Sequence, residues 1–195
     1  MRTIDLRLQT PTSSELNEIL PRASVDITTA IAQIKPLLED VRIRGEEAVV
    51  EVAKKFDDLD PRPLRVSSEE LQAALNSLDP ELRKSIEISI DRVRAVAEAN
   101  IPEDIEVEFT PGAKVSQRWR AVDSVGLYVP GGKAVYPSSV IMNVVPAQAA
   151  GVSRLVIATP AQKDFSGRPH PTVLATAALL GVEEVLAIGG PAAVA

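Results

Sequence analysis

The chain has 195 residues, 45% of them hydrophobic and 25% charged, so it is long enough to bury a core and has the composition of a soluble globular protein. Its formal net charge of −6 and its lack of any Lys or Arg cluster argue against a nucleic-acid-binding surface. The absence of cysteine excludes disulfides and thiolate metal sites. Because no apolar run reaches the roughly 18 residues of a membrane span and the first residues lack a signal-peptide core, we expect a cytoplasmic protein that does not bind membranes.

Residues 1–103 predict a helical N-terminal arm. Asp26 can cap a first helix, because apolar residues recur after it at helical spacing. Gly45 interrupts this pattern, which resumes in "EEAVVEVAKKFD" and ends at the prolines of "DDLDPRP".

Two further helices of this arm have clear start signals. Ser67 and Glu70 have the spacing of a capping box ahead of "ELQAALNSL". Asp79-Pro80 begins the longest predicted helix, since proline is favoured in the first turn. One apolar stripe runs along it, which indicates core packing. The stripe consists of Leu82, Ile86, Ile90, Val93 and Ala97.

Residues 104–195 predict a Rossmann-like α/β unit. The stretch "IEVEFTPGAKVSQRWRAV" alternates around a Pro-Gly turn and is typical of a hairpin. Three short apolar strands follow, in "SVGLYVP", "RLVIATP" and "EEVLAIGG", and helical segments ending at Gly151 and Gly181 separate them. This order predicts a right-handed parallel βαβαβ unit, which we expect to be incomplete at its C-terminal end.

Parallel sheets of this kind bind ligands at the carboxyl ends of their strands. The loops after Val129, Thr159 and Ile188 are expected to meet there. The turn Pro130-Gly131-Gly132 lies at the first of these ends, where glycines let the backbone approach a ligand and the next helix N-terminus favours anionic groups.

Two standard nucleotide-binding loops do not match this turn. A Walker loop needs Ser or Thr after its lysine, but Ala134 follows Lys133. The dinucleotide fingerprint G-x-G-x-x-G is absent from every strand-to-helix turn. Spacing alone therefore leaves two interpretations open, a ligand site and a plain tight turn.

The residue types do not provide a complete catalytic centre. A catalytic zinc site needs about three protein ligands, typically including histidine, and His170 is the only histidine in the chain. Its position in "GRPHP" is typical of a loop or helix start. No Ser/His/Asp or Cys/His set can be assembled. We therefore assign no catalytic residue and no metal ligand, and expect the isolated chain to bind no stoichiometric zinc.

The segment "VGLYVPGGKAVYPSSVIMNVVPAQAAGV" resembles the signature region of the histidinol dehydrogenase family. The segments "VRIRGEEAVVEVAKKFD", "RVRAVAEANIP" and "HPTVLATAALLGVEEVLAIGG" resemble that family in the same order. The resemblance implies an enzyme of histidine biosynthesis that oxidises L-histidinol through L-histidinal to L-histidine, using two NAD and a catalytic zinc. It also implies a homodimer whose Rossmann-like core lacks the usual glycine fingerprint.

The resemblance assigns cofactor-binding residues at the opening turn. Tyr128 matches the family tyrosine that contacts NAD, and Pro130 lies beside it. A tyrosine offers a flat ring face and a hydroxyl, although packing at a strand end is the alternative role. Ser138, Ser139 and Asn143 would face the same cleft if the helix begins near Pro137, and helix capping explains the two serines equally well.

Two departures from the family pattern affect the expected function. The family commonly has a glutamine at the NAD site two residues after the Gly-Gly of its third strand, where this chain has Ala192. Family members are also considerably longer than a chain ending at Ala195. We expect the zinc ligands and the glutamate–histidine acid/base pair in the part beyond that residue, so catalysis by these residues alone is not expected.

Two other functions remain open. A non-catalytic interaction or dimerisation protein could use the helical arm and an exposed sheet edge, since open edges and uncovered apolar faces favour association. A small nucleotide-binding module of different purpose is the third possibility.

Overall fold

The computed structural model describes residues 4–7, 9–19, 27–132 and 134–195, so Asp26 and Lys133 lie outside the described residues. The chain divides into two compact units, Met1–Lys35 and Pro36–Ala195. The predicted boundary between residues 103 and 104 stays a prediction. Within the described ranges, no helix is long and apolar enough to cross a membrane.

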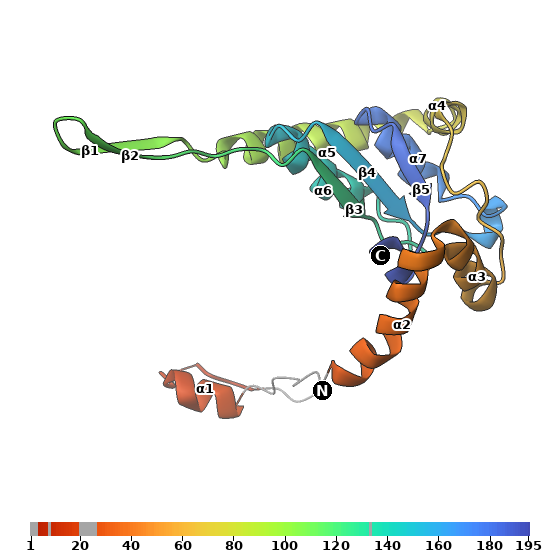
Figure 1. The fold of residues 1–195 in the computed structure, drawn as a ribbon, viewed down its shortest axis with the longest axis horizontal. Coiled ribbons are helices and arrows are strands. Elements are labelled where there is room, and N and C mark those ends of the chain that lie inside the picture. Colours follow the sequence, from red (N-terminus) through yellow and green to blue (C-terminus); the bar gives the residue numbers. More distant parts are fainter. Residues whose placement is uncertain (1–3, 8, 20–26, 133) are drawn as a thin grey trace. The chain divides into compact units, whose positions relative to one another are not determined.

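Helices precede and alternate with strands in this α/β chain (Figure 1). The α-helices are α1 (Ser13–Ile19), α2 (Thr28–Arg44), α3 (Glu46–Asp57), α4 (Ser68–Asn76), α5 (Pro80–Ala99), α6 (Pro137–Ala149) and α7 (Pro171–Leu179). The strands are β1 (Ile105–Thr110), β2 (Ala113–Gln117), β3 (Ser124–Tyr128), β4 (Arg154–Thr159) and β5 (Glu184–Ala187). Short 3₁₀ helices cover Lys163–Phe165 and Gly190–Ala193.

The start signals of α4 and α5 form as predicted. The backbone N–H of Glu70 donates to Ser67 Oγ at 3.2 Å, and the backbone N–H of Ser67 donates to Glu70 Oε2 at 2.7 Å, which completes the capping box. Asp79 Oδ1 accepts the N–H groups of Glu81 and Leu82 at 3.0 and 2.9 Å. Both helix starts are therefore fixed by side chains that the sequence places there.

The predicted stripe of α5 is buried only from its second turn onward. Ile86 and Ile90 belong to the core, and Val93 and Ala97 pack against it. Leu82, in the first turn, stays exposed. Core packing is confirmed for most of the stripe and is wrong for Leu82.

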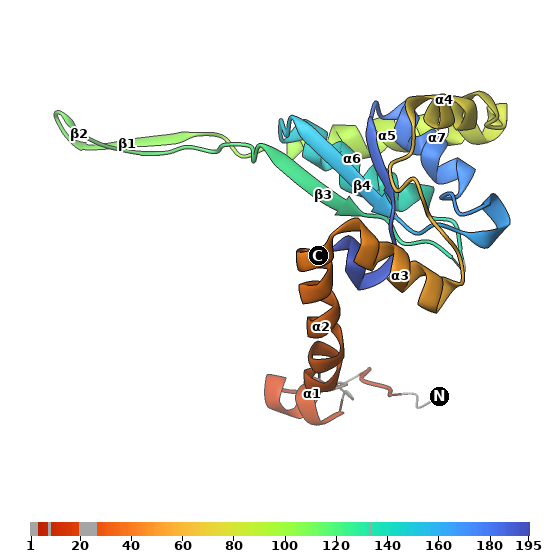
Figure 2. The same cartoon turned by 45° about the vertical axis from the view of Figure 1, so that its right-hand side comes forward.

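The three-stranded sheet is parallel, with the order β3-β4-β5. Helices α5, α6 and α7 lie along one face of it (Figures 1 and 2). Helix α4 packs on α7, α7 on α6, and α6 on α5, so the two helices between the strands connect α4 and α5 to the sheet. This confirms the predicted α/β class with its parallel sheet and preceding helices.

The core lies between this helix layer and the sheet. Because strand side chains alternate between faces, every second residue of each strand points at the helices. The largest fully buried aliphatic side chains are Ile157, Val66, Val129, Val140, Val144, Val145 and Val185.

A short segment before α4 covers the β5 edge of the sheet. The N–H of Val66 donates to Val185 O at 2.8 Å, and the N–H of Ala187 donates to Leu64 O at 2.7 Å. Arg65 and Leu186 form the antiparallel bridge between these bonds. The backbone groups of β5 that face outward are thus paired, as a sheet edge requires.

Candidate functional site

The loops at the carboxyl ends of the three parallel strands pack closely together. Pro160 follows β4 and lies next to glycines of both other loops. A Cβ atom on Gly189 would lie 2.9 Å from Pro160 Cβ, and one on Gly131 would lie 3.4 Å from Pro160 Cδ. Glycine at both positions therefore lets the loops after β3 and β5 approach the loop after β4.

Tyr128 connects the first and third of these strand ends. Its hydroxyl oxygen accepts the backbone N–H of Gly190 at 3.1 Å. Its side chain is 39% exposed, so the ring is anchored at its polar tip while part of its surface stays open. The structure thus places the predicted Tyr128 at the meeting point of the loops. Its assignment to NAD stays a prediction.

The turn after Tyr128 runs from Pro130, which is exposed, to Gly132, where the backbone turns sharply. Gly132 has a φ of 100°, a conformation that residues with a Cβ rarely adopt. This part of the turn presents backbone rather than large side chains, and the role of Pro130 in binding stays a prediction.

Helix α6 begins at Pro137, the start on which the prediction for its polar residues depended. The Nδ2 of Asn143 donates to the backbone oxygen of Tyr128 at 3.4 Å, which brings this side chain to the strand end. The N-cap of α6 is Tyr136, and it makes no side-chain capping bond. Ser138 is exposed and Ser139 half-buried, both inside the first turn and therefore not at the capping position.

Gln162, in the loop after β4, is a candidate that the sequence patterns did not identify. Its side-chain Nε2 lies 3.3 Å from the position that a Cβ on Gly131 would take, so its amide borders the opening turn. An amide two residues beyond the strand-end proline is the signal that could have indicated it, because polar side chains at these ends orient ligands.

Ala192 stands where the family resemblance predicts a glutamine. It lies in the short 3₁₀ helix after β5 and is buried. It lines a small cavity with Val49, Val52 and Ala53 of α3. An alanine offers no hydrogen bond from its side chain, so this position contributes packing rather than polar recognition.

His170 is the N-cap of α7, which confirms the prediction of a helix-start residue. Its Nδ1 accepts the N–H of Thr172 at 3.1 Å. The imidazole stands edge-on to Phe165, with ring centroids 4.7 Å apart. Burial lowers the pKa of His170 below its ordinary value of 6.5, because a charged imidazolium is poorly solvated there.

The described residues contain no cluster of metal-ligating side chains. Within residues 4–7, 9–19, 27–132 and 134–195, no group of three or more His, Cys, Asp or Glu side chains could hold a metal. The residues that meet at the strand ends are instead aromatic, amide and glycine residues (Tyr128, Asn143, Gln162, Gly131, Gly189 and Gly190). Such a set can bind an organic cofactor through ring contact and hydrogen bonds.

The chain matches the histidinol dehydrogenase family over residues 20–195. Histidinol dehydrogenase of Nocardia farcinica is 53% identical to it over 98% of this chain, and that of Mycolicibacterium smegmatis is 50% identical over 100%. The chain spans 43% and 44% of these two relatives.

The fold agrees with a solved relative. Histidinol dehydrogenase from Elizabethkingia anophelis matches 94% of this chain with a TM-score of 0.82 and 28% identity, and 42% of that protein is covered. The sequence match and the α/β fold lead to the same assignment. The chain belongs to the histidinol dehydrogenase family.

Proposed function

We propose that this chain supplies the NAD-binding part of an oxidoreductase that converts L-histidinol through L-histidinal to L-histidine, in the cytoplasm, as a step of histidine biosynthesis. The observation that carries the proposal is the anchored but accessible ring of Tyr128 at the carboxyl ends of three parallel strands. Family membership and the general binding position of open parallel sheets support it.

Each residue of the site has a distinct role in this proposal. The open surface of Tyr128 packs against the cofactor, and Pro130 and Gly131 let the chain pass close to it without bulky side chains. The Asn143 amide and the Gln162 amide provide hydrogen-bonding groups next to the turn. When bound, NAD would supply the hydride acceptor: one NAD would be consumed in oxidising the alcohol to the aldehyde, and a second in oxidising the hydrated aldehyde to the acid.

Zinc chemistry is not assigned to these residues, because no suitable ligand set exists among those that the structure describes. A catalytic acid/base pair is not assigned either. Oxidation of L-histidinol is therefore proposed for a complete family enzyme, with a homodimer as its expected assembly. The 195-residue chain alone is expected to be inactive.

A turnover assay tests this assignment. L-histidinol, NAD and zinc are added to the 195-residue chain and to a complete family enzyme, and NADH formation is followed by its ultraviolet absorbance. We expect NADH only with the complete enzyme. Turnover by the 195-residue chain at a comparable rate would show that its own residues perform the chemistry and would overturn the proposed division of roles.

A non-catalytic interaction or dimerisation protein is the second candidate. The observation that favours it is a set of large apolar side chains on β1 and β2 that no part of the described chain covers. The two functions are separated by adding NAD in the absence of substrate. Association between chains without any NAD binding would favour the interaction protein.

A further inference from the structure

The loop after β4 closes on itself between Gln162 and Arg168. The N–H of Gln162 donates to Arg168 O at 3.1 Å, and the two residues form an isolated antiparallel bridge. Gln162 O accepts the N–H groups of Phe165 and Gly167 at 3.2 and 3.0 Å. Because both backbone groups of Gln162 are bonded within the loop, its side chain is the part that is left to bind a ligand.

The segment that precedes α4 holds this loop from outside. Arg168 donates to the backbone oxygens of Pro61 and Pro63 at 3.3 and 2.6 Å. A Cβ atom on Gly167 would lie 2.8 Å from the backbone oxygen of Asp60, so glycine lets the loop and the segment touch. These contacts fix the position of the loop beside the segment.

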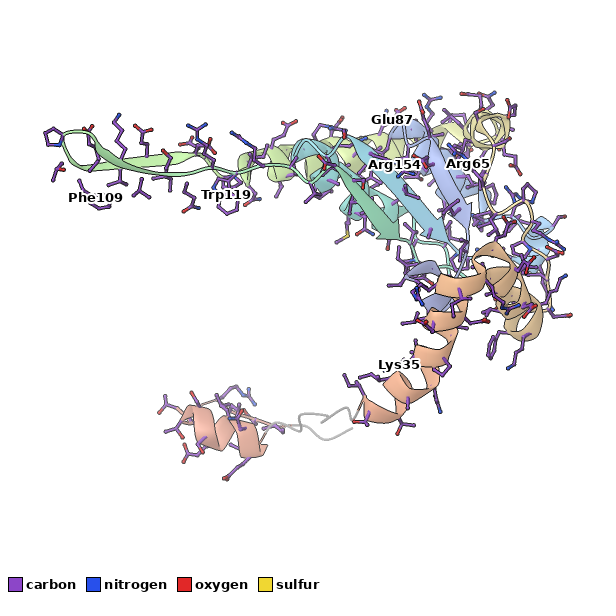
Figure 3. The ribbon with its side chains drawn as sticks, in the orientation of Figure 1. Lys35, Arg65, Glu87, Phe109, Trp119 and Arg154 are labelled. Atoms are coloured by element: carbon purple, nitrogen blue, oxygen red, sulfur yellow. The ribbon has the colours of Figure 1, made fainter. Side chains whose placement is uncertain are left out.

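The same segment is tied to the sheet by side chains as well as by its backbone. Arg65 Nη1 lies 4.0 Å from Glu184 Oε2, and Arg154 Nε lies 2.8 Å from Glu184 Oε1. Figure 3 shows both arginines at the sheet. Loop, segment and sheet therefore form one connected unit, in which Gln162 has a fixed place.

Gln162 provides the first side chain beyond β4 that can hydrogen-bond a ligand. Thr159 ends the strand and is buried, and Pro160 and Ala161 have no polar side-chain atoms. The Gln162 side chain is half-buried, and its Nε2 lies 3.3 Å from the place of a Cβ on Gly131. Its amide has no hydrogen-bond partner among the residues that the structure describes. A polar group without a partner therefore borders the turn that the cofactor is proposed to approach.

The cations of the loop are already engaged. Lys163 Nζ lies 2.9 Å from Asp58 Oδ2, and Arg168 Nε lies 2.7 Å from Glu70 Oε1. A phosphate dianion is bound best by a free lysine or arginine, whereas a neutral amide both donates to and accepts from a hydroxyl group. The loop is thus suited to a sugar hydroxyl rather than to a phosphate.

The place of Gln162 in the fold indicates which sugar this is. In parallel folds that bind dinucleotides, the pyrophosphate lies at the first strand-to-helix turn, and a side chain further along the βαβ unit holds the adenosine ribose 2′-hydroxyl. Here β3 and β4 are the first two strands of the parallel sheet. Gln162, beyond the end of β4, takes the position of the ribose-binding side chain, which in such folds is usually acidic.

We propose that Gln162 binds the adenosine ribose of NAD, with its amide hydrogen-bonded to the 2′-hydroxyl. This inference rests on the NAD-binding function proposed above and adds the part of the cofactor that this loop recognises. Because the loop holds Gln162 in place before binding, little conformational entropy is lost when the hydrogen bond forms. NADP should bind more weakly than NAD, since its 2′-phosphate would meet no free cation in the loop.

Calorimetric titration of NAD into the 195-residue chain and its Gln162→Ala variant measures the contribution of the amide. We expect the variant to bind NAD about 5-fold more weakly, which is the usual effect of losing one neutral hydrogen bond. Gln117→Ala is the matched control, because Gln117 is an exposed glutamine of β2, on the hairpin that extends away from the sheet (Figures 1 and 2). It should bind NAD like the unmodified chain, and circular dichroism checks that both variants fold.

An NAD analogue without the adenosine 2′-hydroxyl shows whether the amide contacts that group. The unmodified chain should bind the analogue about 5-fold more weakly than NAD, whereas Gln162→Ala should bind both ligands equally, because the contact is already absent. The same preference for NAD in both proteins would overturn the proposal, since Gln162 would then act only through packing against Gly131.

Gln162→Arg supplies the loop with the cation that a 2′-phosphate requires. We expect this variant to shift the ratio of the two affinities toward NADP by about 10-fold, because a guanidinium pairs with the phosphate. An unchanged ratio in the folded variant would place the 2′ position away from this loop and contradict the proposal.

The ribose assignment and the cofactor function can fail separately. If the unmodified chain and Gln162→Ala bind NAD equally well, the ribose assignment falls and NAD binding stands. If neither the unmodified chain nor the Gln117→Ala control binds NAD, the cofactor function falls and the ribose assignment falls with it.

Discussion

Tyr128 combines a fixed hydroxyl with an open ring, and this combination explains why a tyrosine suits the end of β3. The bond from the Gly190 N–H ties the loop after β5 to β3 across the intervening strand. Phenylalanine could cover the strand end equally well but could not make this bond. The position of Tyr128 at the strand end was predictable from topology, whereas its bond to Gly190 was not, because spacing does not reveal contacts between residues so far apart in sequence.

His170 gives a pH-dependent contribution to stability. Its Nδ1 must be unprotonated to accept the N–H of Thr172, and burial lowers its pKa in the folded chain below 6.5. The unfolded chain therefore takes up the proton first as pH falls. The contribution is complete above about pH 6.5 and is lost as pH falls through the folded-state pKa.

Urea unfolding between about pH 8 and about pH 5 measures this effect. We expect His170→Asn to flatten the decline in the free energy of unfolding toward acid pH, because asparagine caps a helix without titrating. An unchanged decline in this variant would show that other groups cause it.

At the scale of elements, Arg168 holds the segment that covers the sheet edge. Its guanidinium donates to the backbone oxygens of Pro63 at 2.6 Å and Arg65 at 3.2 Å. Its Nη2 also donates to Glu70 Oε2 at 3.0 Å. Its Nε lies 2.7 Å from Glu70 Oε1 as an ion pair, although that N–H does not point at the oxygen.

Replacing this arginine should destabilise the chain. Arg168→Ala would leave several backbone oxygens without donors, so we expect a loss of about 2–4 kcal/mol in the free energy of unfolding. Arg154→Ala, which removes an exposed ion pair to Glu184, should have a much smaller effect. Denaturant melts of the two variants make the comparison. Equal losses would mean that Arg168 acts only as a surface charge.

The helices and strands were largely predictable, because their signals are local. The capping box at Ser67 and the Asp79-Pro80 start both form as expected. The pairing of Leu64–Val66 with β5 was not predictable, since it joins distant parts of the chain through backbone atoms after a proline-rich stretch. Gln162 was missed because the sequence does not show that its side chain borders Gly131, which lies in the loop after another strand. Sequence patterns locate elements and their ends better than they locate contacts between loops.

At the scale of the whole molecule, the residue types available as zinc ligands lead to a prediction for the 195-residue chain. With one histidine, no cysteine and no carboxylate cluster among the described residues, it should hold no stoichiometric zinc. Elemental analysis of the chain after dialysis against zinc-free buffer checks this. About one tightly held zinc ion per chain would reveal a ligand set that these residues do not provide.

The central claim, that the loops around Tyr128 bind NAD, is tested most directly by calorimetric titration of NAD into the chain and its Tyr128→Ala variant. We expect saturable binding to the unmodified chain, weak because Ala192 offers no side-chain hydrogen bond. The variant should lose about 1–3 kcal/mol of binding free energy, since the ring face and the hydroxyl disappear together. Equal affinities, or no binding to either protein, would contradict the account and return Tyr128 to strand-end packing.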